Sequence, residues 1–215
     1  MKTMWISCLL QLIIISGTIA FADNSIILDK PFETVALDIV KAMKNRKTER
    51  NYTNQIISQQ HLSTLLWAAY GINRQDGKHT VPTAYGKDYI KIYVIYNEKS
   101  YKYIPEKNLL QFIQSNVATS MASTQGWVGK SRCVVVIVAD VNAFPFYVGA
   151  KEEKIRLANL TAGCIAQNVY LISAALHIGT CLVAGVNETG CRKALKLNDT
   201  DIPLIVMPLG YLNSK

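Results

Sequence analysis

The longest apolar pattern in the chain runs from Glu152 to Gly185. Charged residues open it, and from Ala158 onward small and apolar side chains occupy nearly every position. The pattern predicts a helix from Glu153 to His177, ended by Gly179, and then a short strand over Cys181–Val183. A helix that is apolar on every side is expected to be buried, and this one would be about 40 Å long at ~1.5 Å per residue. We therefore expect it to cross a whole core or a subunit interface.

A membrane-spanning role for this helix is disfavoured. Its uninterrupted apolar runs are shorter than the ~20 residues that a bilayer requires, and the polar pair Gln167 and Asn168 lies in the middle. We expect no stable membrane span in the mature chain.

Two amphipathic helices are predicted before the middle of the chain. The first covers 32–45, and the second covers Gln59–Tyr70, with Ser58 as its N-cap and Gly71 at its end. The expected inner faces are Val35, Ile39, Val40 and Met43 in the first helix, and Leu62, Leu65, Leu66 and Ala69 in the second.

The remaining pattern predicts a sheet with further helices. The continuous apolar run Cys133–Ala139 is typical of a central strand buried on both faces. Other strands are expected at Tyr89–Tyr96, Tyr101–Tyr103 and Leu204–Leu209, and further helices at Leu109–Met121 and Arg192–Leu197. Few strands joined by long connections favour an α+β sandwich in which helices flank a mixed sheet, as one domain over 23–215.

The first 22 residues resemble a signal peptide. Lys2 precedes an apolar stretch, and Ala20-Phe21-Ala22 before Asp23 fits an A-x-A cleavage site. Cleavage would remove one positive charge and leave +7 of the +8 on the full chain. We expect export to the periplasm or the exterior.

Charge and cysteines add little chemistry of their own. The lysines are scattered and no nucleic-acid-binding motif is present, so we expect no nucleic acid partner. Four cysteines remain after cleavage, and neither a C-x-x-C pair nor a metal-like group with histidine occurs, so we expect no metal site. Cys133, Cys164, Cys181 and Cys191 are either free thiols, mostly buried, or include one disulfide between Cys181 and Cys191.

A basic segment after the first helix is the first candidate site. Arg46, Thr48 and Arg50 alternate, so in an extended segment their side chains would face one way and offer two guanidinium groups and a hydroxyl to an anion. The alternative is ordinary solvated surface charge. Dinucleotide, phosphate-loop, nucleophile-elbow and zinc-protease motifs are absent, which favours a tightly held organic cofactor if the protein is an enzyme.

Four segments in this order resemble the nitroreductase family of flavin enzymes. They are 46–50 (RKTER), 66–74 (LWAAYGINR) with 82–84 (PTA) behind it, the long helix with Gly163 and Gln167-Asn168, and 179–185 (GTCLVAG). The tyrosine-rich hairpin between Tyr93 and Tyr103 is similar to a subgroup that includes peptide azoline oxidases. The resemblance implies a homodimer in which the long helices pack together and two FMN sites lie at the interface.

The resemblance also implies roles for individual residues. Arg46, Lys47, Thr48 and Arg50 match positions that bind the ribityl chain, the phosphate and the polar edge of the flavin. Pro82, Thr83 and Ala84 match a loop that reaches the flavin, in many members across the interface. The backbone of Ala184 and Gly185 matches the turn near flavin N5 and O4, and Lys215 stands in for a basic C-terminal residue on the phosphate.

The implied activity is hydride transfer through flavin N5 to a nitro compound, quinone or similar small acceptor, by a ping-pong mechanism. NAD(P)H is the reductant that the family implies, although little of it is expected outside the cytoplasm. Two alternatives stay open: an oxidase or dehalogenase-like reductase on the same scaffold, and an exported flavin-binding protein without turnover.

Overall fold

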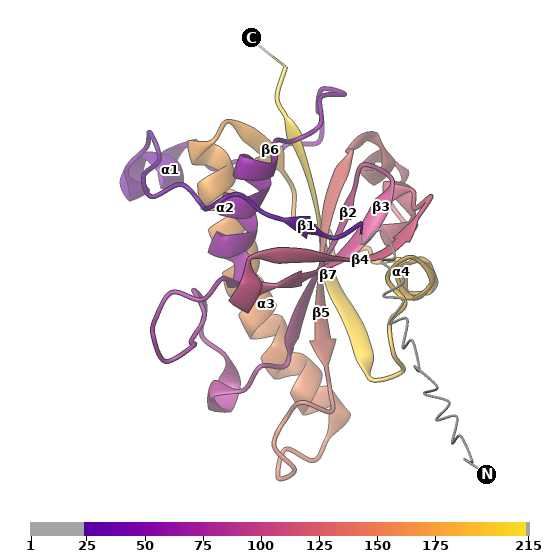
Figure 1. The fold of residues 1–215 in the computed structure, drawn as a ribbon. Helices are drawn as coiled ribbons and strands as arrows, with labels where there is room; N and C mark the ends of the chain where they lie inside the picture. Colours follow the sequence, from indigo (N-terminus) through magenta and orange to yellow (C-terminus); the bar gives the residue numbers. More distant parts are fainter. Residues whose placement is uncertain (1–23, 214–215) are drawn as a thin grey trace, which may run out of the picture.

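A seven-stranded sheet with helices on both faces forms the fold of residues 24–213, which the structure, a computed structural model, describes (Figure 1). The strands are β1 (Ile26–Ile27), β2 (Ile90–Tyr96), β3 (Lys99–Ile104), β4 (Leu109–Ser115), β5 (Cys133–Asp140), β6 (Ile178–Thr180) and β7 (Asp201–Tyr211). The helices are α1 (Ile39–Asn45), α2 (Gln59–Tyr70), α3 (Lys151–Ala175) and α4 (Glu188–Leu195). The predicted α+β class is confirmed.

The strands follow the order β1-β4-β3-β2-β5-β7-β6, and each described ladder is antiparallel. The expected mixed sheet is therefore an antiparallel one. Tight connections favour this arrangement, because two antiparallel neighbours can be joined by a two-residue hairpin. Asn97 and Glu98, both with positive φ, form such a turn between β2 and β3.

Strand β5 separates two hydrophobic cores, as its continuous apolar run predicted. Cys133, Val135 and Ile137 face the core beneath α2 and α3, whereas Val134 and Val136 face the core beneath α4. The whole run Cys133–Ala139 is buried, which confirms a strand covered on both faces. In Figure 1, α1, α2 and α3 lie on one side of the sheet and α4 on the other.

Helix α2 has the predicted bounds. The Ser58 side chain accepts a hydrogen bond from the His61 N–H at its start, and the four expected inner residues are almost fully buried. Gly71 follows the last turn with φ −71°, so a left-handed conformation does not explain it. A Cβ at Gly71 would lie 2.3 Å from Trp67 Cδ1, so close packing requires the glycine.

The predicted helix Leu109–Met121 is wrong. Residues Leu109–Ser115 form β4, which pairs with β3 from Ile104 opposite Leu109 to Lys99 opposite Ser115. Leucine and glutamine are good helix formers, but pairing with a neighbouring strand overrides this local preference. Only Thr119–Ala122 at the end of the segment forms a short 3-10 turn.

Helix α1 is shorter than predicted and is not covered in the single chain. It begins at Ile39, where the Asp38 side chain accepts a hydrogen bond from the Lys41 N–H. Ile39, Val40 and Met43 are exposed, and the buried residue of the helix is Ala42. The predicted inner face is therefore wrong for an isolated chain.

The ends of the long helix and the strand after it differ from the prediction. Helix α3 ends at Ala175, and His177 takes the positive φ that was expected of a glycine, while Gly179 lies inside β6. The predicted strand at Cys181–Val183 begins after β6, although Val183 forms an isolated bridge with Val206.

The predicted bounds of the two last elements are wrong: α4 starts earlier than Arg192 and ends at Leu195 instead of Leu197, and β7 extends beyond the predicted strand at both ends. Helix α4 starts at Glu188 because the Asn187 side chain caps it by accepting from the Gly190 N–H. The predicted final strand Leu204–Leu209 is confirmed inside β7.

Candidate functional site

The basic segment after α1 runs along the ends of β6 and β7. The Glu49 N–H donates to the Thr180 carbonyl at 2.9 Å, which ties the segment to the last residue of β6. The Tyr52 hydroxyl donates to the Glu49 carbonyl at 2.6 Å and so fixes the bend that follows. The segment therefore has a defined position against the sheet.

Two glycines allow this close approach. Gly179 and Gly210 lie opposite each other in the β6–β7 ladder. A Cβ at Gly210 would lie 2.5 Å from Tyr52 Cβ, and a Cβ at Gly179 would lie 3.0 Å from Glu49 Cβ. Any other residue at Gly210 would push the basic segment away from the sheet.

Arg46, Thr48 and Arg50 form one edge of the segment, which we call the cationic edge. The Arg46 guanidinium carbon lies 5.2 Å from the centre of the Tyr170 ring, and that of Arg50 lies 5.4 Å from the Trp127 ring. Thr48 Oγ1 lies 3.1 Å from the Tyr170 hydroxyl. Among the described residues neither guanidinium has a carboxylate partner, so both charges are available to an anion.

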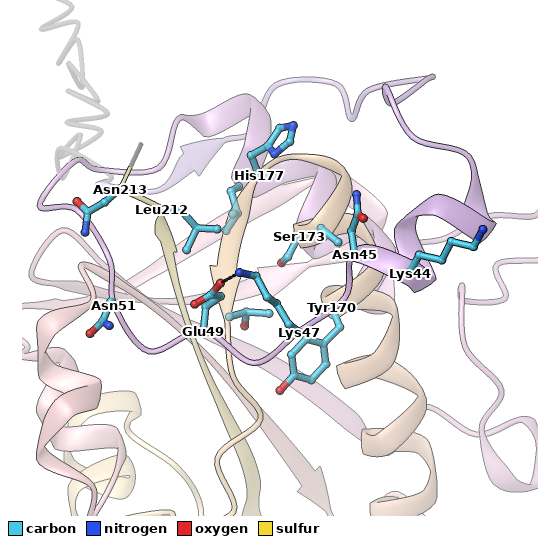
Figure 2. Close-up of a pocket in the computed structure, with 13 residues that line it drawn as sticks. Lys44, Asn45, Lys47, Glu49, Asn51, Tyr170, Ser173, His177, Leu212 and Asn213 are labelled. Atoms are coloured by element: carbon cyan, nitrogen blue, oxygen red, sulfur yellow. Dashed lines mark ion pairs between the residues drawn. The ribbon is translucent and has the colours of Figure 1, made fainter. Parts of the chain in front are cut away.

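Lys47 lies on the opposite edge, as alternation in an extended segment requires. It forms an ion pair with Glu49, and both side chains line a groove of about 820 Å³ (Figure 2). Ser173 and His177, at the end of α3, also line this groove. The structure thus brings together three of the four predicted basic-segment side chains and separates Lys47 from them.

The turn at Ala184 and Gly185 lies beside the loop that carries Trp127. The Gly185 carbonyl accepts from the Thr124 N–H at 3.0 Å and from the Ser123 hydroxyl at 2.7 Å. The Trp127 indole N–H donates to Gln125 Oε1 at 2.8 Å. This loop therefore links the ring under Arg50 to the predicted backbone turn.

Two backbone donors in the turn are free. Within residues 24–213 the N–H groups of Ala184 and Gly185 donate to no acceptor, and Ala184 is exposed. A buried or bound ligand with acceptor atoms would satisfy them. Flavin carries such atoms at its polar edge, so these residues fit the cofactor that the sequence predicted.

The loop Pro82–Ala84 lies beside the middle of α3. The Thr161 hydroxyl donates to the Pro82 carbonyl at 3.2 Å, and the Ala84 N–H donates to the Tyr89 hydroxyl at 2.7 Å. Thr161 and Tyr170 are nine residues apart on one helix, which is about 14 Å at ~1.5 Å per residue. Within one chain this loop therefore does not meet the cationic edge.

The cysteines are free thiols across the described part of the chain, and Cys133, Cys181 and Cys191 are buried. Burial raises the pKa of the Cys181 thiol, and the nearby Arg50 guanidinium opposes this. Burial also raises the pKa of Cys191 to about 12. A disulfide between Cys181 and Cys191 is not formed.

Sequence reasoning missed Tyr170 and Trp127. Tyr170 looked like one more large residue of a buried helix, and Trp127 lay between the predicted helix Leu109–Met121 and the predicted strand Cys133–Ala139. Guanidinium groups stack on aromatic rings, so Arg46 and Arg50 indicated that aromatic partners would lie near the basic segment. Which rings they would meet depends on contacts between segments about 80 to 120 residues apart in the chain.

Some predicted features lie outside the described residues, namely the signal peptide 1–22 and Lys215. From residue 24 to residue 213, no helix is both long and apolar enough to cross a membrane. Over the same range, no three His, Cys, Asp or Glu side chains are grouped as a metal site would need.

Fold and site together define an α+β protein in which a cationic edge and free backbone donors meet at one end of an antiparallel sheet. The chain belongs to the nitroreductase family, whose sequence model matches residues 43–211. It is 30% identical over 175 residues to a Methanocaldococcus jannaschii protein assigned by name to the nitroreductases, covering 77% of this chain and 86% of that protein.

The fold of this chain is also similar to those of solved structures. A Ralstonia eutropha protein, also assigned to the nitroreductases, superposes with a TM-score of 0.80 at 25% identity, over 92% of this chain and 93% of its own. A chain of the E. coli microcin synthetase complex McbBCD, solved with truncated pro-MccB17 bound, superposes with a TM-score of 0.66 at 17% identity, over 98% of this chain and 85% of its own. The second likeness shows the shared fold and is compatible with the subgroup that the hairpin suggested.

Proposed function

We propose that this protein is an FMN-dependent oxidoreductase that reduces a nitro compound, a quinone or a similar small acceptor. Membership of the nitroreductase family supports an oxidoreductase of a generally flavin-dependent kind. The observation that supports FMN as the cofactor is the pair of guanidinium groups on the cationic edge, neither of which is paired with a carboxylate in the described residues. The Trp127 loop connects this edge to the free N–H groups of Ala184 and Gly185.

The chain's own residues would bind and orient the cofactor. Arg46 and Arg50 offer positive charge to the phosphate and the polar edge of the flavin, and Thr48 offers a hydroxyl. The N–H groups of Ala184 and Gly185 would donate to acceptor atoms of the ring. Lys47 lies on the far edge, so its contribution would come from its backbone, whose N–H donates to no acceptor in the described residues. When bound, FMN would supply hydride transfer from a reduced donor such as NAD(P)H to the acceptor in two half-reactions.

We propose a homodimer built on α3. The helix leaves one face uncovered in the single chain, formed by Leu160, Gly163, Cys164 and Gln167. Packed against the same face of a second copy in antiparallel fashion, with the crossing between Ile165 and Ala166, the helix would bring Thr161 of the partner subunit level with Tyr170. The loop that contacts Thr161 would then approach the cationic edge from the second subunit, so each site would be complete only in the dimer.

Export is part of the proposed function. The N-terminal sequence supports cleavage near Ala22 and a periplasmic or secreted mature chain. In that compartment the physiological donor could differ from NAD(P)H, so a chemical reductant is included among the donors to be tried.

The test is the visible spectrum of the purified mature protein. We expect a yellow protein that releases FMN on denaturation and whose flavin is bleached by a chemical or nicotinamide reductant, with colour restored by a nitroaromatic compound or a quinone. Colour restored by dioxygen alone would favour the flavin oxidase. A yellow protein that reacts with no donor or acceptor would favour a flavin-binding protein without turnover, and a colourless protein that FMN cannot reconstitute would contradict the proposal.

A further inference from the structure

Tyr170 joins three parts of the candidate site. Its ring lies under the Arg46 guanidinium, and its hydroxyl contacts both Thr48 and the backbone of Leu182. The residue is buried on α3, so its position is set by the helix and not by solvent. A single side chain thus connects the long helix to both predicted cofactor segments.

The directions of these hydrogen bonds follow from what each group can do. The Leu182 N–H can only donate, and it lies 2.8 Å from the Tyr170 oxygen, so the hydroxyl accepts there. The tyrosine then has one proton to give. Thr48 Oγ1, at 3.1 Å, is a stronger acceptor than the other nearby candidate, the Cys181 sulfur. On this ranking of acceptors we assign the Tyr170 hydroxyl as the donor and Thr48 Oγ1 as the acceptor.

This direction leaves the Thr48 proton pointing away from Tyr170. Thr48 lies between Arg46 and Arg50 on the cationic edge, and both neighbours are donors without an acceptor role. Three donors in a row match a group that only accepts hydrogen bonds and carries negative charge. A phosphate monoester has this chemistry, whereas a hydroxyl or amide ligand would present donors of its own.

We propose that Tyr170 is a positioning residue that makes Thr48 a hydrogen-bond donor to the phosphate group of the bound flavin. The assignment rests on the proposed FMN site. It adds that recognition of the phosphate depends on a hydroxyl pair from α3 and the basic segment, in which the Tyr170 hydroxyl acts on the phosphate through Thr48 and does not touch it.

The experiment is a double-mutant cycle with two ligands. Dissociation constants for FMN and riboflavin are measured by flavin fluorescence on refolded or stripped dimer for the wild type, Tyr170→Phe, Thr48→Val and the double variant. We expect each single variant to weaken FMN binding about tenfold, as for loss of one hydrogen bond to a charged group, and the double variant to be no weaker than Thr48→Val. Riboflavin binding should change less than twofold in all three.

Two controls separate positioning from general damage. Tyr70→Phe removes a buried hydroxyl on α2 whose ring stacks on His79 and not under a guanidinium of the cationic edge, so FMN binding should stay at the wild-type value. Thr48→Ser keeps the hydroxyl and should recover most of the FMN affinity that Thr48→Val loses.

The outcomes distinguish the assignment from the site itself. If Tyr170→Phe has no effect, if it weakens FMN equally in the Thr48→Val background, or if it weakens riboflavin as much as FMN, the role of Tyr170 is overturned while the flavin site stands. If the wild-type protein binds neither flavin, the proposed function fails and the assignment fails with it.

Discussion

Arg46 and Arg50 are the residues on which the candidate site depends most directly. Both guanidinium groups stack on aromatic rings instead of pairing with carboxylates, so they are held in place without being neutralised. A preorganised charge of this kind binds an anion with less loss of side-chain freedom than a mobile lysine would.

Arg50→Ala and Arg46→Ala should each weaken FMN binding. A charge-assisted hydrogen bond contributes ~1.5–3 kcal/mol, so the dissociation constant should rise roughly ten- to a hundredfold. Fluorescence titration of the stripped protein measures it. Arg132→Ala is the matched control, because Arg132 is exposed and its guanidinium donates to Asn97 in the β2–β3 turn. Titration curves that match the wild type in both test variants would remove the anion-site interpretation.

The variant Gly185→Val tests the proposed flavin contact at the backbone turn of Ala184 and Gly185. A Cβ there would lie 2.9 Å from Thr124 Oγ1 and 3.1 Å from Gln125 Nε2, so Gly185→Val should displace the loop that supports Trp127 and occupy space beside the free N–H groups. We expect a folded dimer with little flavin. The measurement is the ratio of flavin to protein absorbance on the dimer peak of a sizing column after incubation with excess FMN.

Gly126→Val is the control for this variant, because a Cβ at Gly126 meets nothing within 4 Å although it lies in the same loop. It should keep the wild-type flavin ratio. A wild-type ratio in Gly185→Val as well would refute the proposed contact at Ala184 and Gly185.

Three strands are joined at one end of the sheet by a half-buried ion triad. Lys91 of β2 contacts Asp140 of β5 at 2.8 Å and Asp201 of β7 at 2.7 Å. Burial lowers the pKa of Lys91, but its hydrogen bonds to the two carboxylates outweigh this and raise it above 10.5. Burial raises the pKa of Asp140, but hydrogen bonds from Lys91 and from the Asn142 N–H hold it below 3.8.

These two shifts define a pH window for the stability that the triad contributes. The part from Asp140 is present above its ordinary pKa of 3.8 and is lost as pH falls through its lower folded value. The part from Lys91 is present below its ordinary pKa of 10.5 and is lost as pH rises through its higher folded value.

Lys91→Met should destabilise the fold at neutral pH. It leaves two carboxylates together, one of them almost fully buried, and loss of one partner of a buried pair costs ~3–5 kcal/mol, reduced here to about 2–3 because the site is partly open to solvent. Urea unfolding at pH 7 and pH 4.5 measures it. The deficit should shrink at the lower pH, where protonation relieves the repulsion, and an exposed control, Lys107→Met, should lose little at either pH. A deficit that does not depend on pH would show that packing alone is lost.

Apolar side chains of α1 and α3 remain exposed to solvent on one side of the single chain. Leu160 on α3 is 61% exposed, and Ile39, Val40 and Met43 on the neighbouring α1 are exposed as well. A Cβ at Gly163, in the middle of the α3 face, would meet nothing within 4 Å, so a second helix could approach closely there. These features support a subunit interface on this side of the sheet.

Leu160→Glu should break the dimer. A charge placed on the α3 face would have to be buried without a partner in the dimer, so light scattering at micromolar concentration should give the monomer mass instead of the dimer mass. Flavin retention should fall together with the dimer, since the loop Pro82–Ala84 would no longer reach the second site. Lys151→Glu, exposed at the start of α3, is the control and should remain dimeric. A wild-type chain that is monomeric under these conditions would contradict the proposed assembly.

Prediction from sequence succeeded for features that are determined by one short stretch of residues. The cap at Ser58 and the inner face of α2 were predicted correctly, and so was the buried strand Cys133–Ala139. The opposite directions of Arg46 and Lys47 also follow from local alternation, although the family resemblance had grouped them together. Prediction from sequence failed at Leu109–Ser115, because pairing with β3 stabilises this segment more than its local preference for helix does.

Hydrophobic periodicity and capping residues are local properties, so the amino-acid order alone determined the α+β class, the position of the long helix and the row of donors at Arg46, Thr48 and Arg50. Contacts between distant segments decided the rest. The Gly179–Gly210 pair that seats the basic segment, the ring of Tyr170 beneath Arg46 and the uncovered face of α3 exist only once the sheet is assembled. The physical reason is that packing and strand pairing depend on which surfaces meet in the folded chain. Thr48 and Tyr170 are more than a hundred positions apart, and the local sequence around either residue does not indicate that their hydroxyl groups will be in contact.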